Sequence, residues 1–112
     1  MIKAIFHIDE SFKWDLLLGN VRNVILASEP GYEVEVLANS EAVPFYIEAS
    51  HNRYLAPMTE LAKLGVHFAV CNNSIQKFGI EPKQLAGFVE IVPVGVLEII
   101  HKQADGYAYI KP

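Results

Sequence analysis

The sequence predicts one α/β domain, a three-layer α/β/α sandwich built on about five mostly parallel strands. Three observations support this prediction. The 112 residues are enough for one hydrophobic core but not for two. Short apolar segments typical of strands alternate along the chain with segments of helical periodicity. The segments between strands are long enough for the right-handed crossovers that join parallel strands.

The first third of the chain predicts a strand, a helix and a second strand. Residues 2–8 are mostly apolar, as in a strand covered on both faces. Ser11 is expected to cap a helix whose apolar residues recur at helical spacing over 14–25. A turn at 29–31, Glu-Pro-Gly, should follow that helix. Residues 32–37 alternate glutamate with apolar residues, which predicts a strand nearer the sheet edge with one face less covered.

The middle of the chain predicts two more helices and the third strand. Residues 39–40 should end the second strand and cap a helix that begins near Glu41. A surface loop is expected at 50–53, followed by a helix over 57–64 that a proline opens and a glycine terminates. Residues 66–70 form a mostly apolar run, which is typical of a buried parallel strand.

The last third of the chain completes the alternation of strands and helices. Residues 72–78 predict a short helix that stops at a glycine, and Pro82 predicts one further helical turn. A fourth strand is expected over 89–92, a last helix over 96–104 and a final short strand over 107–110. This pattern predicts the order of the elements along the chain but not the order of the strands in the sheet.

Composition and charge narrow the classes of function. Apolar residues make up 52% of the chain and charged residues 20%, as in compact globular proteins. The net charge of −4, without a basic cluster, argues against a nucleic-acid partner. Charged residues, Pro and Gly interrupt the longest apolar stretch, 88–100, and the amino terminus lacks the apolar region of a signal peptide. With its single cysteine, the chain is expected to be cytoplasmic and to bind no membrane.

The chain carries none of the motifs of the common cofactors. There is no Gly-x-Gly-x-x-Gly after the first strand and no phosphate-binding loop with its lysine. The four histidines lack metal-ligand spacing, and there is no Cys-x-x-Cys for dithiol exchange within one chain. We therefore expect no cofactor and no metal. Any sulfur chemistry must use one sulfur atom of this chain, or a second one from a partner.

The single cysteine, Cys71, occupies the most informative position in the sequence. It closes the predicted strand 66–70 and opens the predicted helix 72–78. A thiol at the amino end of a helix faces unpaired N–H groups and the positive end of the helix dipole, which stabilise the reactive thiolate. Open α/β sheets also bind ligands outside the carboxyl ends of their strands. Both arguments predict a site at the sulfur of Cys71.

Other polar residues are expected at the same edge, because parallel strands end on one side of the sheet. We therefore predict Cys71 as the catalytic residue, with pocket candidates drawn from the ends of four strands: His7, Asp9, Asn39, Asn72, Asn73, Ser74 and Gly95. Plainer alternatives stay open. A lone cysteine is often only a packing residue, a histidine at a strand tip is often structural, and the asparagines serve equally well as helix caps.

The residues around Cys71 resemble those of the DsrE/DsrF-like family of small sulfur-relay proteins. The resemblance lies in the strand, cysteine and short helix of residues 65–75, followed by Gly79-Ile80. Residues 6–9, 92–96 and 103–112 resemble a subgroup of single-domain relatives, so the likeness spans residues 1–112 as one domain. It implies a flavodoxin-like fold that assembles into trimers or hexamers.

In the relay members of the family, the matching cysteine accepts a persulfide sulfur from a donor protein and passes it on. The resemblance therefore implies a sulfurtransferase-like carrier role for Cys71, with donor and acceptor proteins as partners. Asn72-Asn73 departs from the small apolar residues usual after that cysteine. Two alternatives are a non-catalytic binding module with a small anion or metabolite at the carboxyl edge, and a purely structural oligomer joined through the last helix and the aromatic tail.

Overall fold

The structure, a computed structural model, describes residues 1–28 and 31–112. Within these residues the strands are β1 (Ile2–Ile8), β2 (Tyr32–Ala38), β3 (His67–Cys71), β4 (Val89–Val92) and β5 (Ala108–Ile110). The α-helices are α1 (Trp14–Ala27), α2 (Leu55–Lys63), α3 (Asn72–Lys77) and α4 (Gly95–Ala104). Short 3-10 helices are η1 (Ser11–Lys13), η2 (Ser40–Tyr46), η3 (Glu48–Ser50) and η4 (Pro82–Gln84).

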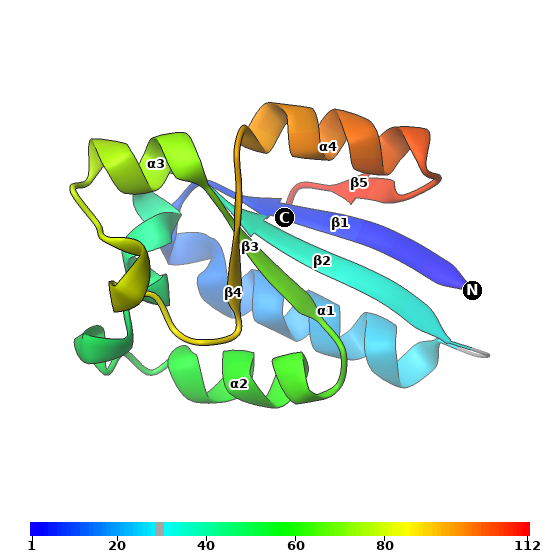
Figure 1. The fold of residues 1–112 in the computed structure, drawn as a ribbon. Coiled ribbons are helices and arrows are strands. Elements are labelled where there is room, and N and C mark those ends of the chain that lie inside the picture. Colours follow the sequence, from blue (N-terminus) through cyan, green and yellow to red (C-terminus); the bar gives the residue numbers. More distant parts are fainter. Residues whose placement is uncertain (29–30) are drawn as a thin grey trace.

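The strands form one parallel sheet in the order β4-β3-β2-β1-β5. Figure 1 shows α1 and α2 on one face of the sheet and α4 on the other. This division follows from handedness: the first crossovers run from β1 toward β4, whereas α4 leads back across the sheet to β5. Right-handed crossovers in opposite directions must use opposite faces. The predicted α/β/α sandwich is confirmed.

The two faces of the sheet are covered unequally. The face toward α1 and α2 packs a large core that includes Phe6, Trp14, Tyr46 and Phe68. The face toward α4 has a small apolar cluster of three buried residues, Ile5, Leu37 and Ala69, with three partly buried ones packed against it. The layer under α4 is therefore thin, and polar side chains of the strands remain on this face.

The prediction that residues 32–37 lie nearer a sheet edge is wrong, because β2 is the central strand. Its alternation has another cause. Val34 and Val36 join the large core, whereas Glu33 and Glu35 face the thinly covered α4 side. A central strand with one half-covered face shows the same alternation of polar and apolar residues as an exposed edge strand. The prediction that one face of this strand is less covered is confirmed, but the predicted position of the strand in the sheet is not.

Two predicted helix caps are wrong. Ser11 lies in η1 and donates its backbone N–H to Glu41 Oε1 at 3.2 Å, so α1 begins after it, at Trp14. Asn39 precedes η2, but its side chain makes no cap hydrogen bond. The helix expected near Glu41 is a 3-10 helix, since Pro44 lacks the N–H that an α-helix from Ser40 requires.

The other predicted elements lie within a few residues of those observed. Helix α2 begins at Leu55, before Pro57, and ends at Lys63; Gly65 follows it with a φ of 95°, which favours glycine. The predicted loop at 50–53 overlaps the end of η3 at Ser50. Residues 29–30 of the predicted turn at 29–31 lie outside the described residues. None of the helices within 1–28 and 31–112 is long and apolar enough to span a membrane.

Candidate functional site

Cys71 is both the last residue of β3 and the residue that caps α3. Its backbone is extended (φ −72°, ψ 125°), and the chain turns into the helix at Asn72 without an intervening loop. Cys71 pairs with Val92 of β4, so the thiol lies next to the end of that strand and the start of α4. Only 6% of the residue is exposed. The sulfur is therefore held between two strand ends and two helix starts.

Backbone N–H groups from both helices point to this sulfur. Gly95, the first residue of α4, donates its N–H to Sγ at 3.4 Å. The backbone N–H groups of Asn73 and Ser74, in the first turn of α3, also stabilise the thiolate, as does the Ser74 hydroxyl. The sequence predicted one helix start at Cys71, that of α3, and the structure shows a second, that of α4.

The pKa of Cys71 reflects two opposing effects. Burial raises the pKa of the thiol, because a charge is poorly solvated beneath the surface. Hydrogen bonds from Gly95, Ser74 and Asn73 lower it, because they are strongest to the anion. The hydrogen bonds prevail, and the pKa of Cys71 lies below its ordinary value. This is the electrostatic environment of a reactive cysteine rather than of an inert buried one.

Gly95 allows α4 to approach the sulfur closely. A Cβ atom at this position would lie 3.2 Å from Cys71 Cβ and 3.4 Å from Sγ. We expect Gly95→Ala to push the helix start away and raise the thiol pKa. Alkylation at neutral pH should then slow by about 3- to 10-fold, since each pKa unit changes the thiolate fraction about tenfold. The measurement is the rate of iodoacetamide modification followed by mass spectrometry.

Gly19→Ala provides the matched control, because a Cβ at this glycine of α1 would meet nothing within 4 Å. It should leave the alkylation rate unchanged. Equal rates for Gly95→Ala and the wild-type protein would show that the N–H of Gly95 does not activate the thiol.

Ser74 connects Cys71 to the end of the central strand. Its hydroxyl is buried, accepts the backbone N–H of Ser40 at 3.0 Å and donates to the sulfur of Cys71. Ser40 has a positive φ of 53°, which orients its N–H toward α3. The sequence placed Ser40 at the end of the second strand but not among the pocket candidates, because its contact with Ser74 depends on an unusual backbone angle that nothing in the sequence indicates.

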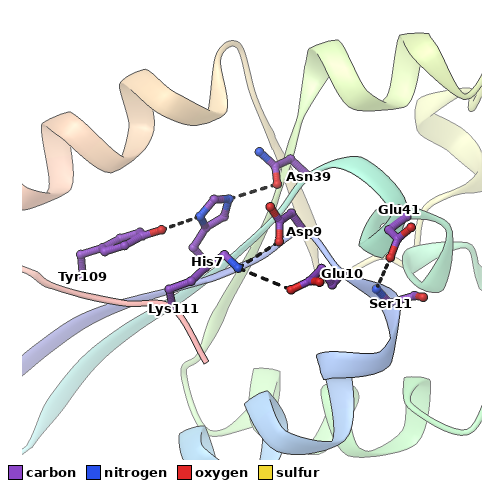
Figure 2. A network of polar contacts seen from close by, with 8 residues as sticks. All are labelled: His7, Asp9, Glu10, Ser11, Asn39, Glu41, Tyr109 and Lys111. Atoms are coloured by element: carbon purple, nitrogen blue, oxygen red, sulfur yellow. Dashed lines mark hydrogen bonds and ion pairs between the residues drawn. The ribbon is translucent and has the colours of Figure 1, made fainter.

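His7 belongs to a different polar network, shown in Figure 2. Its Nδ1 lies 2.8 Å from Tyr109 Oη and its Nε2 lies 3.0 Å from Asn39 Oδ1. The amide oxygen must accept, so Nε2 carries the proton and the tyrosine hydroxyl donates to Nδ1. Strand β2 separates β1 from β3, which places the two backbones about 10 Å apart. Both ring nitrogens of His7 are therefore engaged away from Cys71.

Asp9 is tied to the carboxyl-terminal tail. Lys111 Nζ lies 3.0 Å from Asp9 Oδ1 and 3.9 Å from Glu10 Oε1 (Figure 2). Sequence reasoning missed Lys111, and it also missed Tyr109, because only the strand order shows that β5 lies beside β1. Six of the seven pocket candidates thus divide between two clusters at the sheet edge.

One cluster surrounds the thiol and contains Asn73, Ser74 and Gly95. The other links β1 to the tail and contains His7, Asp9 and Asn39. Asn72 is half-buried at the start of α3, and the side chain of Asn73 is exposed, so Asn73 acts on the sulfur through its backbone. In the part of the chain that the structure describes, no three or more His, Cys, Asp or Glu side chains are grouped to hold a metal.

Comparisons with known proteins bear on the family and the fold of the chain. The sequence model of the DsrE/DsrF-like family matches residues 20–112, which include Cys71 and both helices that point to it. The chain belongs to the DsrE/DsrF-like family. The family is associated with sulfur relay, so the resemblance noted in the sequence is confirmed at this level.

Three solved structures share the fold. MTH1491, a protein of unknown function from Methanobacterium thermoautotrophicum, is 32% identical, with a TM-score of 0.92 over 100% of both chains. The YchN protein of Escherichia coli is 16% identical, with a TM-score of 0.79 over 100% of both chains. BT1422 from Bacteroides thetaiotaomicron, also of unknown function, is 11% identical, with a TM-score of 0.78 over 98% of this chain and 94% of that one. Among curated proteins, no match was found.

Proposed function

We propose that this DsrE-like protein carries sulfane sulfur as a persulfide on Cys71. The observation that supports the proposal most strongly is the convergence of N–H groups from α3 and α4 on one buried sulfur. These groups stabilise an anion at Sγ, which both the attacking thiolate and the persulfide product require. The association of the family with sulfur relay gives the same chemistry an independent basis.

The transfer needs no net oxidation or reduction. The Cys71 thiolate attacks the outer sulfur of a donor persulfide and forms a new S–S bond. The S–S bond of the donor breaks, and its inner sulfur leaves as a thiolate. An acceptor thiolate then attacks the outer sulfur now held on Cys71. The bond between the two sulfurs of the Cys71 persulfide breaks, and the Cys71 thiolate is restored for the next cycle.

The surroundings of Cys71 suit transfer between proteins. Cys71 ends β3 at the carboxyl edge of the sheet, so the donor and the acceptor are proposed to be proteins that dock at this edge. We place this reaction in the cytoplasm, where a single cysteine remains reduced. Loading the purified protein from a persulfide donor, followed by mass analysis, tests the proposal.

The same geometry suits a second function, that of a binding module without sulfur transfer. Two helix starts facing one point are also a site for a small anion or an anionic metabolite. In that case Cys71 only lines the pocket. A Cys71→Ser variant would keep the ligand of a binding module but would lose the cargo of a sulfur carrier.

We also propose that the protein acts as a homo-oligomer, a trimer or a hexamer. Helix α4 exposes the apolar side chains of Val96, Leu97 and Ile100, and its contacts with the sheet leave only Gly95 buried. Light scattering after gel filtration should give a trimer or a hexamer for the wild-type protein, and Ile100→Glu should disperse it. Leu26→Glu is the control, because Leu26 is exposed on α1, on the other face of the sheet. A wild-type monomer would contradict this proposal.

A further inference from the structure

A second polar site lies beneath α4, away from Cys71. It is a cavity of about 380 Å³ whose wall includes the amino-terminal half of β2, two residues of α4 and Tyr107 just before β5. Glu35 reaches it from β2, and Glu98 and Lys102 reach it from α4. The proposed sulfur chemistry uses none of these residues. The cavity exists because α4 covers this face of the sheet only thinly.

Glu35 is the unusual residue of this cavity. It is 5% exposed, although it is a charged residue in the central strand of a parallel sheet. Its Oε1 lies 3.6 Å from Lys102 Nζ. Its Oε2 is buried and, among residues 1–28 and 31–112, finds no hydrogen-bond partner. Buried carboxylate oxygens without a partner are rare in native proteins, so this atom indicates a missing group.

The charges of the cavity wall indicate the kind of group that is missing. The wall carries four glutamates and one lysine. Tyr107 donates its hydroxyl to Glu33 Oε2 at 2.8 Å, and His67 lies 3.6 Å from Glu90 at the rim. Among the wall residues that the structure describes, Lys102 is then the one cation beside both Glu35 and Glu98. When Glu35 and Glu98 are both ionised, the floor of the cavity therefore has more negative than positive charge.

We propose that this cavity binds a small organic cation with N–H donors, an ammonium or a guanidinium, which donates to Oε2 of Glu35. An organic cation fits better than a divalent metal ion, because the Lys102 ammonium already lies beside the same carboxylate and repels a compact double charge strongly. A guanidinium spreads its charge and donates several hydrogen bonds in a plane, which suits a pair of neighbouring carboxylates.

Binding at this site is coupled to a proton. Burial, and then the neighbouring Glu98 carboxyl, raise the pKa of Glu35 from 4.5 to about 8, while Lys102 acts in the opposite direction. Without a ligand, Glu35 thus holds a proton at neutral pH, and a cation must displace it. The charged or titratable groups around Glu35 come from every neighbouring element: Lys3, Tyr32, Glu33, Tyr46, His67, Glu90, Glu98, Lys102 and Tyr107.

The experiment is a calorimetric titration with n-butylguanidinium, whose charge stays constant between pH 7 and pH 9. Affinity should be about tenfold higher at pH 9 than at pH 7, because the ionised fraction of Glu35 rises by that factor. Glu35→Gln should bind much more than tenfold more weakly than the wild-type protein at pH 9, and its affinity should not depend on pH. Glu48→Gln, an exposed glutamate of η3, is the matched control and should behave as wild type.

Two further probes separate the stated chemistry from simple charge attraction. n-Butyltrimethylammonium has the same charge but no N–H donor and should bind at least tenfold more weakly, and Mg²⁺ should not compete. Equal affinity for the two organic cations, competition by Mg²⁺, or no saturable binding of n-butylguanidinium would overturn the proposal. If Glu35→Gln fails to fold, Glu98→Gln takes its place as the test variant. The pH dependence of the wild-type affinity is a second test, because an affinity that does not change with pH would also contradict the proposal.

Discussion

The Cys71→Ser protein is expected to take up no sulfur from a persulfide donor under conditions that load the wild-type protein. Cys71 is the single thiol of the chain, and a serine hydroxyl at this position neither ionises at neutral pH nor forms a persulfide. Mass spectrometry of the intact protein should show the added mass of one sulfur atom or more in the wild-type protein only. The loss should be complete rather than partial.

The controls separate loss of chemistry from loss of structure. Circular dichroism and thermal unfolding should be close to wild type, because the serine hydroxyl accepts the Gly95 N–H in place of the thiol. Gly19→Ala, far from the thiol, should load normally. Sulfur retained by a folded Cys71→Ser protein would place the cargo elsewhere, and a wild-type protein that takes up none would leave Cys71 as a packing residue.

Glu35→Gln is expected to stabilise the protein at high pH and to change little at low pH. The pKa of Glu35 is raised from 4.5 to about 8 by burial and by Glu98. A raised carboxyl pKa means that the folded protein binds the proton more tightly than the unfolded chain does. Its contribution to stability is therefore fully present below about pH 4.5 and is lost as the pH rises through about 8.

The stability that the wild-type protein loses with rising pH follows from 1.36 kcal/mol for each unit of pKa shift. At pH 9, Glu35→Gln should be more stable than the wild-type protein by about 3 to 5 kcal/mol in chemical denaturation, and at pH 5 the two should differ by less than about 1 kcal/mol. Comparing the variant with the wild-type protein removes the titration of other groups. A difference that is the same at both pH values would show that Glu35 is ionised throughout.

Most of the fold was predictable because it depends on local patterns. Mostly apolar runs predicted β1, β3 and β4 to within a residue or two, and helical spacing predicted α1 and α4. Strand order was not predictable, since it depends on which crossover covers which face. That gap produced the wrong placement of β2 at an edge, because alternation reports how well a face is covered and not where the strand lies.

The candidate site was predictable where it depends on neighbours in sequence and not where it depends on packing. The step from strand to helix at Cys71 predicted Ser74 as a neighbour of the thiol, since it lies in the first turn of α3. The contact of Ser40 with Ser74 was not predicted, because it depends on the positive φ of Ser40. Glu35 was placed on the less covered face of its strand, and its burial was not predicted, because nothing in the sequence shows that α4 would cover it.

The most direct test of the central claim is the rate of Cys71 alkylation as a function of pH in the native wild-type protein. The convergence of N–H groups from α3 and α4 predicts that the thiolate forms at a pKa below the ordinary value of free cysteine. The rate should therefore rise and reach its plateau at a lower pH than that of a free cysteine peptide measured alongside. A profile that matches the peptide, or a thiol that reacts slowly at every pH, would contradict an activated cysteine and with it the sulfur-carrier function.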